Sequence, residues 1–185
     1  NMKAKRDFLK AYGWDERARM GTDMTKKVPP PLSQKSIPHD VTLIDLVPIK
    51  DLESGSTSLI ETIQNRQSRR RYTQDPLTLE EFSFLLWSTQ GLRKTDNNDN
   101  PSRRTVPSAG GRHPFETYII VNRVSELEPG LYRYLPLDHK VYLLKNDPNL
   151  SSKVSEAARG QAFVGQGAVV FIWTAIPYRA EWRFS

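Results

Sequence analysis

The sequence predicts an α+β fold, because helical and strand patterns occur in blocks and do not alternate. Three observations support this. Two helical patterns with N-terminal capping signals lie between residues 58 and 91. Runs of β-branched and aromatic residues follow, from residue 117 onward. Two of these runs are separated by turn residues, as in an antiparallel hairpin.

The composition fits one domain with one hydrophobic core, since the chain has 185 residues. A net charge of +6 predicts a surface that favours an anion, such as a phosphate, a nucleotide, nucleic acid or a lipid headgroup. The chain has no cysteine, which excludes disulfides, thiolate nucleophiles and iron–sulfur ligation by its own residues. No apolar stretch is long enough to span a membrane, and the N-terminus is charged where a signal peptide would be apolar, so we expect a soluble, uncleaved protein. The lack of cysteine agrees with a reducing compartment, so a cytoplasmic location is expected.

Residues 1–57 are expected to form an extended N-terminal arm before a domain at 58–185. The arm contains the run Lys26-Lys27-Val28-Pro29-Pro30-Pro31, in which the prolines exclude a regular helix or a central strand. Such an arm wraps a partner or its own body, or else it is a disordered tail. The sequence does not decide between these alternatives.

The first helix of the domain is predicted to begin after Ser58, which forms a capping-box pattern with Glu61. Three apolar residues then follow with the spacing of one helix face: Leu59, Ile60 and Ile63.

A second helix is predicted to begin after Thr78, which forms the same pattern with Glu81, and to end at Gly91. Its apolar stripe should lie in the core and consists of Phe82, Leu85 and Leu86. A polar loop is expected over Asp96–Pro101.

Four strands are predicted in the second half of the chain. Residues 117–121 read as a buried strand, and 131–134 and 141–144 as the two strands of a hairpin. The most apolar run, 168–173, is typical of a central strand covered on both faces. Weaker helical patterns occupy 150–158 and 179–184.

Several kinds of catalytic site are excluded by their missing motifs. There is no nucleophile elbow, Walker loop or zinc-protease pair, and the three histidines are scattered. The cluster Gly165-Gln166-Gly167 precedes a strand, whereas a dinucleotide-binding loop must follow one. If the protein is an enzyme, a bound cofactor should therefore supply the reactivity.

The first candidate binding motif is the arginine-rich segment, Arg66-Gln67-Ser68-Arg69-Arg70-Arg71-Tyr72. In a helix, Arg66 and Arg70 would stand one above the other, and their repulsion favours an anion between them. Guanidinium groups can bind a phosphate or the polar edge of a heterocycle, and the Ser68 hydroxyl adds a contact. The alternatives are a solvated basic face or a nucleic-acid patch.

The second candidate motif is the loop Pro107-Ser108-Ala109-Gly110-Gly111-Arg112-His113-Pro114, which leads into the first strand. Its two glycines would let the backbone approach a flat ligand and offer N–H donors. The alternative is an ordinary turn, in which His113 fixes the loop by hydrogen bonding.

Together these motifs resemble the nitroreductase-like FMN-dependent oxidoreductases, in their SagB-type dehydrogenase branch. The resemblance runs from about Ser58 to Ala175 and includes the segment Gly130-Leu131-Tyr132-Arg133-Tyr134. The arm, with Gly21-Thr22 and its prolines, is similar to the segment that precedes the domain in that branch.

The resemblance implies an intertwined homodimer with a mixed, mainly antiparallel sheet flanked by helices, and one FMN in each of two interface clefts. It places Arg66, Gln67, Ser68 and Arg70 on the FMN phosphate, ribityl chain and pyrimidine edge. The other subunit would supply Pro107, Ser108, Ala109 and Gly110. Arg69 and Arg71 are expected on the solvated side. The family's C-terminal part has no counterpart before Ser185, so we expect an incomplete domain.

The implied activity is hydride transfer through flavin N5, from NAD(P)H or an organic donor to a small acceptor such as a nitroaromatic or a quinone. No catalytic side chain is assigned, because the flavin carries the chemistry, and no metal, membrane or nucleic-acid partner is expected. Within the family, a peptide azoline dehydrogenase and a flavin-destroying enzyme stay open. Outside it, the alternatives are a nucleic-acid-binding protein and a non-catalytic scaffold.

Overall fold

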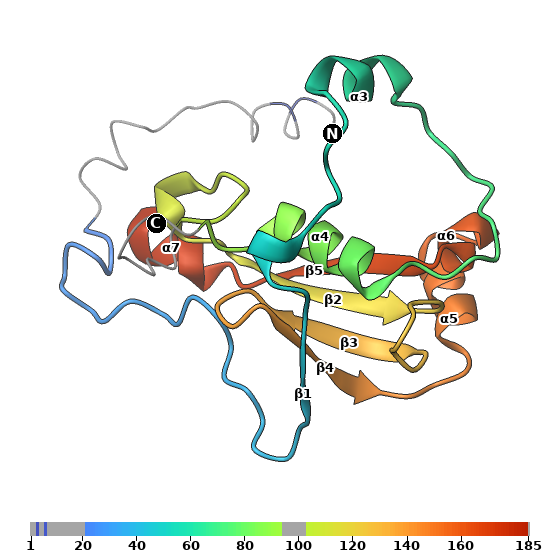
Figure 1. Ribbon diagram of the computed structural model, residues 1–185. Helices are drawn as coiled ribbons and strands as arrows, with labels where there is room; N and C mark the ends of the chain where they lie inside the picture. Colours follow the sequence, from blue (N-terminus) through green and yellow to red (C-terminus); the bar gives the residue numbers. More distant parts are fainter. Residues whose placement is uncertain (1–2, 4–5, 7–20, 94–102, 185) are drawn as a thin grey trace.

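The computed structural model describes Lys3, Arg6 and residues 21–93 and 103–184. Five strands form one sheet in the order β1-β4-β3-β2-β5 (Figure 1), and every pair of neighbours is antiparallel. The predicted α+β class is confirmed. Parallel pairing, which a mixed sheet would include, occurs between Leu77 and Val124 as an isolated bridge. The strands are β1 (Leu43–Asp45), β2 (Phe115–Val121), β3 (Gly130–Leu135), β4 (Lys140–Lys145) and β5 (Val169–Ala175).

The helices surround this sheet on one face and at both ends (Figure 1). Helix α4 lies across one face, α5 and α6 lie at one end, and α7 lies at the other end beside the turn η2. Helix α3 stands apart from the sheet. Their bounds are η1 (Ile49–Asp51), α3 (Leu59–Asn65), α4 (Leu79–Gln90), η2 (Ala109–Gly111), α5 (Leu150–Ala157), α6 (Ala162–Gln166) and α7 (Tyr178–Phe184).

The core lies between α4 and the sheet. Thr78 and Glu81 form the predicted reciprocal capping box at the start of α4, and Gly91 ends the helix. Of the predicted stripe, Phe82 and Leu86 are fully buried, whereas Leu85 is half-buried. The core cluster also includes Leu46, Ile119, Val121, Val124, Tyr132, Tyr134 and Val141.

Helix α3 forms as predicted, but none of its residues is buried against the part of the chain that the structure describes. The Ser58 hydroxyl accepts a hydrogen bond from the Glu61 amide at its start. Its apolar residues Leu59, Ile60 and Ile63 are 74%, 71% and 66% exposed. The helix therefore presents an uncovered apolar face, which the sequence pattern alone would have assigned to the core.

Strand β5 differs from its prediction. It pairs with β2 over its whole length, but among the described residues it is an edge strand and not a central one. Its second half is exposed, including Trp173 at 48%. The apolar sequence of β5 predicts that other elements cover it, but the sequence does not show which elements these are. In the described part of the chain, the second half of β5 is left uncovered.

The described part of the arm runs along the protein's own body. Its strand β1 pairs with β4, and the residue that follows β1, Leu46, is buried. Pro29–Pro31 lie outside regular secondary structure, as predicted. Most of residues 1–20, and the predicted polar loop Asp96–Pro101, fall outside the described residues.

Candidate cofactor-binding site

The arginine-rich segment is not helical. Helix α3 ends at Asn65, Arg66 has extended backbone angles, and no regular secondary structure covers residues 66–72. The predicted stacking of Arg66 over Arg70 in a helix is therefore wrong. An extended chain separates four arginines that a helix would crowd onto neighbouring turns, where like charges repel.

The side chains of this segment offer unused donors. All residues from Arg66 to Tyr72 are exposed. In the described part of the chain, no hydrogen bond or ion pair engages the side chains of Arg66, Gln67 or Ser68. The Arg70 guanidinium lies 5.6 Å from the centre of the Phe163 ring of α6. The segment therefore presents cationic and polar groups to the surface.

The same segment borders a mainly apolar hollow of about 390 Å³. Tyr72, Phe163 and Phe171 are among its lining residues, so α6 and β5 contribute to it. In Figure 1 the chain after α3 descends along the side of the molecule where α5 and α6 lie. The predicted anion-binding segment thus lies near the start of β5.

The predicted loop from Pro107 to Pro114 forms a tight turn that closes on itself. The Ser108 hydroxyl accepts a 2.8 Å hydrogen bond from the His113 amide, and the Gly111 amide donates to the Ser108 carbonyl. Gly110, Gly111 and His113 all have positive φ, of 57°, 64° and 43°. His113 in this conformation is unusual for a residue with a side chain, so the surrounding contacts must stabilise it.

Helix α7 supplies such contacts. The Arg183 guanidinium donates to the Gly110 carbonyl at 3.3 Å, and Nε of Arg112 donates to the Arg179 carbonyl at 3.2 Å. The Arg112 guanidinium also lies 4.6 Å from the centre of the Trp182 ring. A Cβ at Gly110 would lie 2.6 Å from Cδ of Arg183. The positive φ of Gly110, together with this close contact, favours glycine at this position.

The two predicted segments lie at opposite ends of the β2–β5 pair. Phe115, just after the loop, is paired with Ala175, whereas Val121 is paired with Val169 near the arginine-rich segment. Six residues of strand separate these pairs, which corresponds to roughly 20 Å. A single subunit therefore does not bring the two segments together at one ligand.

A buried ionic network, which the sequence analysis missed, lies at the loop end of β2. Glu116 binds Arg133 of β3 at 2.9 Å and Arg179 of α7 at 2.5 Å. Burial acts to raise the pKa of Glu116, but hydrogen bonds from Arg179 and the Lys35 amide and the charge of Arg133 lower it overall. The available signal was an arginine inside an apolar strand, because a buried charge requires a partner.

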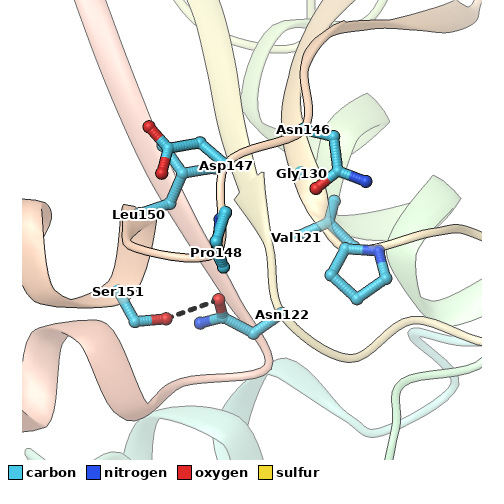
Figure 2. A pocket seen from close by; sticks show the side chains of 9 residues that line it. Val121, Asn122, Gly130, Asn146, Asp147, Pro148, Leu150 and Ser151 are labelled. Carbon is cyan, nitrogen blue, oxygen red and sulfur yellow. Dashed lines mark hydrogen bonds between the residues drawn. The ribbon is translucent and has the colours of Figure 1, made fainter.

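A further hollow at the start of α5 is closed by internal hydrogen bonds (Figure 2). The Ser151 hydroxyl donates to Oδ1 of Asn122 at 2.8 Å, and Nδ2 of Asn122 donates to the carbonyls of Gly165 and Gly167. Hydrogen bonds from Lys153, the Asn149 amide and Lys145 hold the pKa of the nearby Asp147 far below its usual range. This site stabilises the connection from β4 to α5.

His139 could also act as an acid or a base, but both of its ring nitrogens have hydrogen-bond partners. One ring nitrogen lies 3.0 Å from the Tyr134 hydroxyl and the other 3.0 Å from the Val47 carbonyl. Within residues 21–93 and 103–184, no three His, Asp or Glu side chains could hold a metal ion. No helix in that part of the chain is long and apolar enough to cross a membrane.

Comparison with known proteins identifies the family. Residues 63–184 match the family model described as the nitroreductase family, which is more than half of the chain. The protein belongs to the nitroreductase family.

Relatives of this nitroreductase-family chain are longer than it is. A Methanocaldococcus jannaschii protein named as a nitroreductase is 32% identical over 129 residues, which are 70% of this chain and 61% of the relative. The trifolitoxin operon protein TfxC of Rhizobium leguminosarum bv. trifolii is 20% identical over 162 residues, or 82% of this chain and 45% of TfxC.

The nitroreductase fold is also shown by a solved structure. The crystal structure of an Anabaena variabilis protein described as a nitroreductase superposes with a TM-score of 0.61 at 24% identity. The match covers 94% of this chain and 31% of that one. At this identity the likeness establishes the fold and not the substrate.

Proposed function

We propose that the protein is an FMN-dependent oxidoreductase whose cofactor site is shared between two subunits. The observation that carries this proposal is the separation of its two binding segments. In the described part of the chain, the side-chain donors of Arg66, Gln67 and Ser68 are exposed and unpaired, and the loop of residues 107–114, called the Ser108 loop below, lies at the far end of β2. A second subunit would bring the loop of one chain to the arginines of the other.

The donor set of each segment fits FMN. Arg66 and Arg70 can neutralise a phosphate dianion with planar, paired donors, while Gln67 and Ser68 can bind hydroxyl or heterocycle oxygens. The Ser108 hydroxyl already accepts a bond from the His113 amide, so its hydrogen stays available for a ligand. The loop would thus present an oriented donor beside Ala109 and Pro107.

Bound FMN would supply hydride transfer through its N5 atom, with NAD(P)H as the reductant and a nitroaromatic or quinone as the acceptor. The protein's residues would bind and orient the reactants. Guanidinium groups of the arginine-rich segment would stabilise the negative charge of the reduced ring and that of the phosphate. Apolar groups around Phe163 and Tyr72 would exclude water from the cleft.

A homodimer is also proposed, because α3 exposes Leu59, Ile60 and Ile63 on a helix that stands away from its own sheet. Contiguous apolar side chains of this kind are typical of protein interfaces. Since the helix leads directly into Arg66, an interface formed there would also bring a second chain close to the cofactor segment.

A second candidate is a SagB-type azoline dehydrogenase that acts on peptides. This chain is similar over most of its length to TfxC, a protein named for the trifolitoxin operon. That similarity favours the second candidate. The two candidates share the flavin site and differ in the electron donor, since a dehydrogenase would take hydride from the peptide.

The first test is the absorption spectrum of the purified protein with added FMN, followed by addition of NADPH. Arg66→Ala and Ser68→Ala should each weaken FMN binding about tenfold or more, since each removes a direct contact. Arg69→Ala is the matched control, because it removes the same charge from the solvated side, and it should change the affinity less than about threefold.

The outcomes distinguish the candidates. Bleaching of the flavin bands by NADPH supports the reductase, whereas bleaching by an azoline peptide and not by NADPH supports the dehydrogenase. A protein that binds no FMN would contradict both. If that protein binds RNA or DNA with a steep salt dependence, the arginines belong to a nucleic-acid site.

A further inference from the structure

We propose that four buried residues form a network, called the clasp below, that binds the main chain of the arm: Glu116, Arg133, Arg179 and Arg104. The clasp thereby keeps the Ser108 loop in the conformation that binds the cofactor. In this proposal Glu116 is a positioning residue. The part that concerns the cofactor rests on the proposed function, whereas the part that concerns the loop does not.

The clasp binds the arm through its carbonyl groups. Arg133 donates to the Lys35 carbonyl at 2.8 Å and to the Ser36 carbonyl at 3.1 Å. Nε of Arg179 donates to the Leu32 carbonyl at 2.8 Å. Three hydrogen bonds from two buried guanidinium groups thus hold both ends of the arm stretch 32–36 against β3 and α7.

Arg104 adds a third buried guanidinium to the same stretch of arm. It donates to the Ser33 carbonyl at 2.9 Å and to Oε1 of Gln90 at 3.2 Å, while its Nε has no partner in the described part of the chain. Burial, together with the charge of Arg179, lowers the pKa of Arg104 to about 10. The cluster is therefore rich in positive charge.

Glu116 is the carboxylate that compensates this charge. Its two oxygens accept from Arg133 and Arg179, and one of them also accepts from the Lys35 amide at 3.0 Å. Glu116, Arg104, Arg133 and Arg179 are all buried. Removing the negative charge would leave three buried cations, which low-dielectric surroundings disfavour.

The clasp reaches the cofactor loop through His113. A terminal nitrogen of Arg179 donates to the His113 carbonyl at 3.2 Å, and the His113 amide donates to the Ser108 hydroxyl. The Ile176 amide also donates to the Pro114 carbonyl at 2.7 Å. These contacts oppose relaxation of the positive φ at His113, so the orientation of Ser108 depends on Arg179 and, through it, on Glu116.

This network also gives a role to the segment Gly130–Tyr134, which the proposed cofactor site does not use. Arg133 is the fourth residue of this segment and contacts both the arm and Glu116. The buried arginine of the strand and the arm carbonyls that accept its hydrogen bonds therefore stabilise each other.

The test uses Glu116→Gln in the full chain, which preserves the shape of the side chain and removes its charge. Two quantities would be measured: amide hydrogen exchange of residues 107–113 without cofactor, and the dissociation constant for FMN. We expect exchange in the loop about tenfold faster and an FMN dissociation constant about tenfold higher. Exchange in the β3–β4 hairpin should change by less than about threefold.

The matched control is Asp147→Asn, which removes a carboxylate that also binds two cations, Lys145 and Lys153, but at the other end of the sheet. It should leave the loop and the FMN affinity unchanged. If Glu116→Gln does not fold, Lys35→Pro replaces it, because it removes the amide that donates to Glu116 and keeps every charge of the clasp.

The outcomes separate the two proposals. Faster loop exchange with weaker FMN binding supports the clasp as a positioning device. Faster loop exchange in a protein whose wild type binds no FMN supports the clasp and overturns the proposed function. Unchanged loop exchange and FMN affinity in Glu116→Gln, or equal effects of Asp147→Asn, would overturn the clasp.

Discussion

His139 illustrates how a single half-buried side chain connects the arm to the core. Its ring lies between the Tyr134 hydroxyl of β3 and the Val47 carbonyl, which follows β1. Burial lowers the pKa of His139, and the hydrogen bond to Val47 opposes this shift only partly. The ring is therefore neutral in the folded protein at pH values where a histidine in water begins to take up a proton.

This shift predicts a pH-dependent stability. An unfolded histidine titrates near pH 6.5, so the unfolded chain binds a proton that folded His139 does not. The free energy of unfolding should then decrease as the pH falls below about 6.5, and the decrease should end below the folded pKa. Urea unfolding between pH 7.5 and about 5.5 measures this slope.

The variant His139→Asn should lose about 1–3 kcal/mol at neutral pH, because the buried Tyr134 hydroxyl loses its partner. Its stability should also depend less on pH. The exposed His39, replaced in the same way, is the control. An unchanged slope in His139→Asn would assign the pH dependence to another group.

At the residue scale the sequence predicted exposed donors but not buried ones. The exposure of Arg66–Arg71 agrees with a charge run in a polar segment. The partners of Glu116 were not predictable, because Arg133 and Arg179 lie 17 and 63 residues away in the chain. Only the folded sheet brings these charges together.

At the scale of elements, α4 and α3 begin with the same sequence signal but differ in what they bury. Thr78→Ala should cost about 1 kcal/mol of global stability, since α4 covers the core and loses an N-cap. Ser58→Ala is the control. Helix α3 buries no side chain in the chain, so fraying of its first turn should leave core unfolding unchanged. Equal losses measured by thermal unfolding would show that α3 is packed in solution.

Local patterns predicted the elements whose partners are close in sequence. The capping box of α4 and the hairpin of β3 and β4 are confirmed because each depends on residues a few positions apart. Strand β1 was missed, since three residues within a proline-rich arm carry no periodic signal. The position of β5 at the sheet edge was also missed, because hydrophobicity does not determine the order of strands.

At the scale of the whole molecule, the separated cofactor segments make function depend on assembly. Ile63→Asp should weaken the proposed dimer at least about tenfold, because it places a charge in an apolar interface. Sedimentation velocity over a range of protein concentrations measures this change. FMN binding should weaken in parallel, since each site would use both chains.

Leu144→Asp is the control for this variant, because Leu144 is 41% exposed at the end of β4, away from α3. It should leave both assembly and flavin binding unchanged. A protein that stays monomeric at every concentration and still binds FMN would contradict the shared site, although membership of the nitroreductase family would stand.

The clasp binds carbonyl oxygens, and every amino acid supplies the same carbonyl. Lys35 and Ser36 direct their side chains to solvent while Arg133 holds their backbone. Except for proline at position 35, which removes the amide bound to Glu116, mutations at these two positions can therefore accumulate without loosening the arm, and sequence alignment would underestimate its structural importance. Because the chain contains no cysteine, Ser36→Cys would also create a unique thiol for attaching a fluorescent reporter close to the proposed cofactor loop.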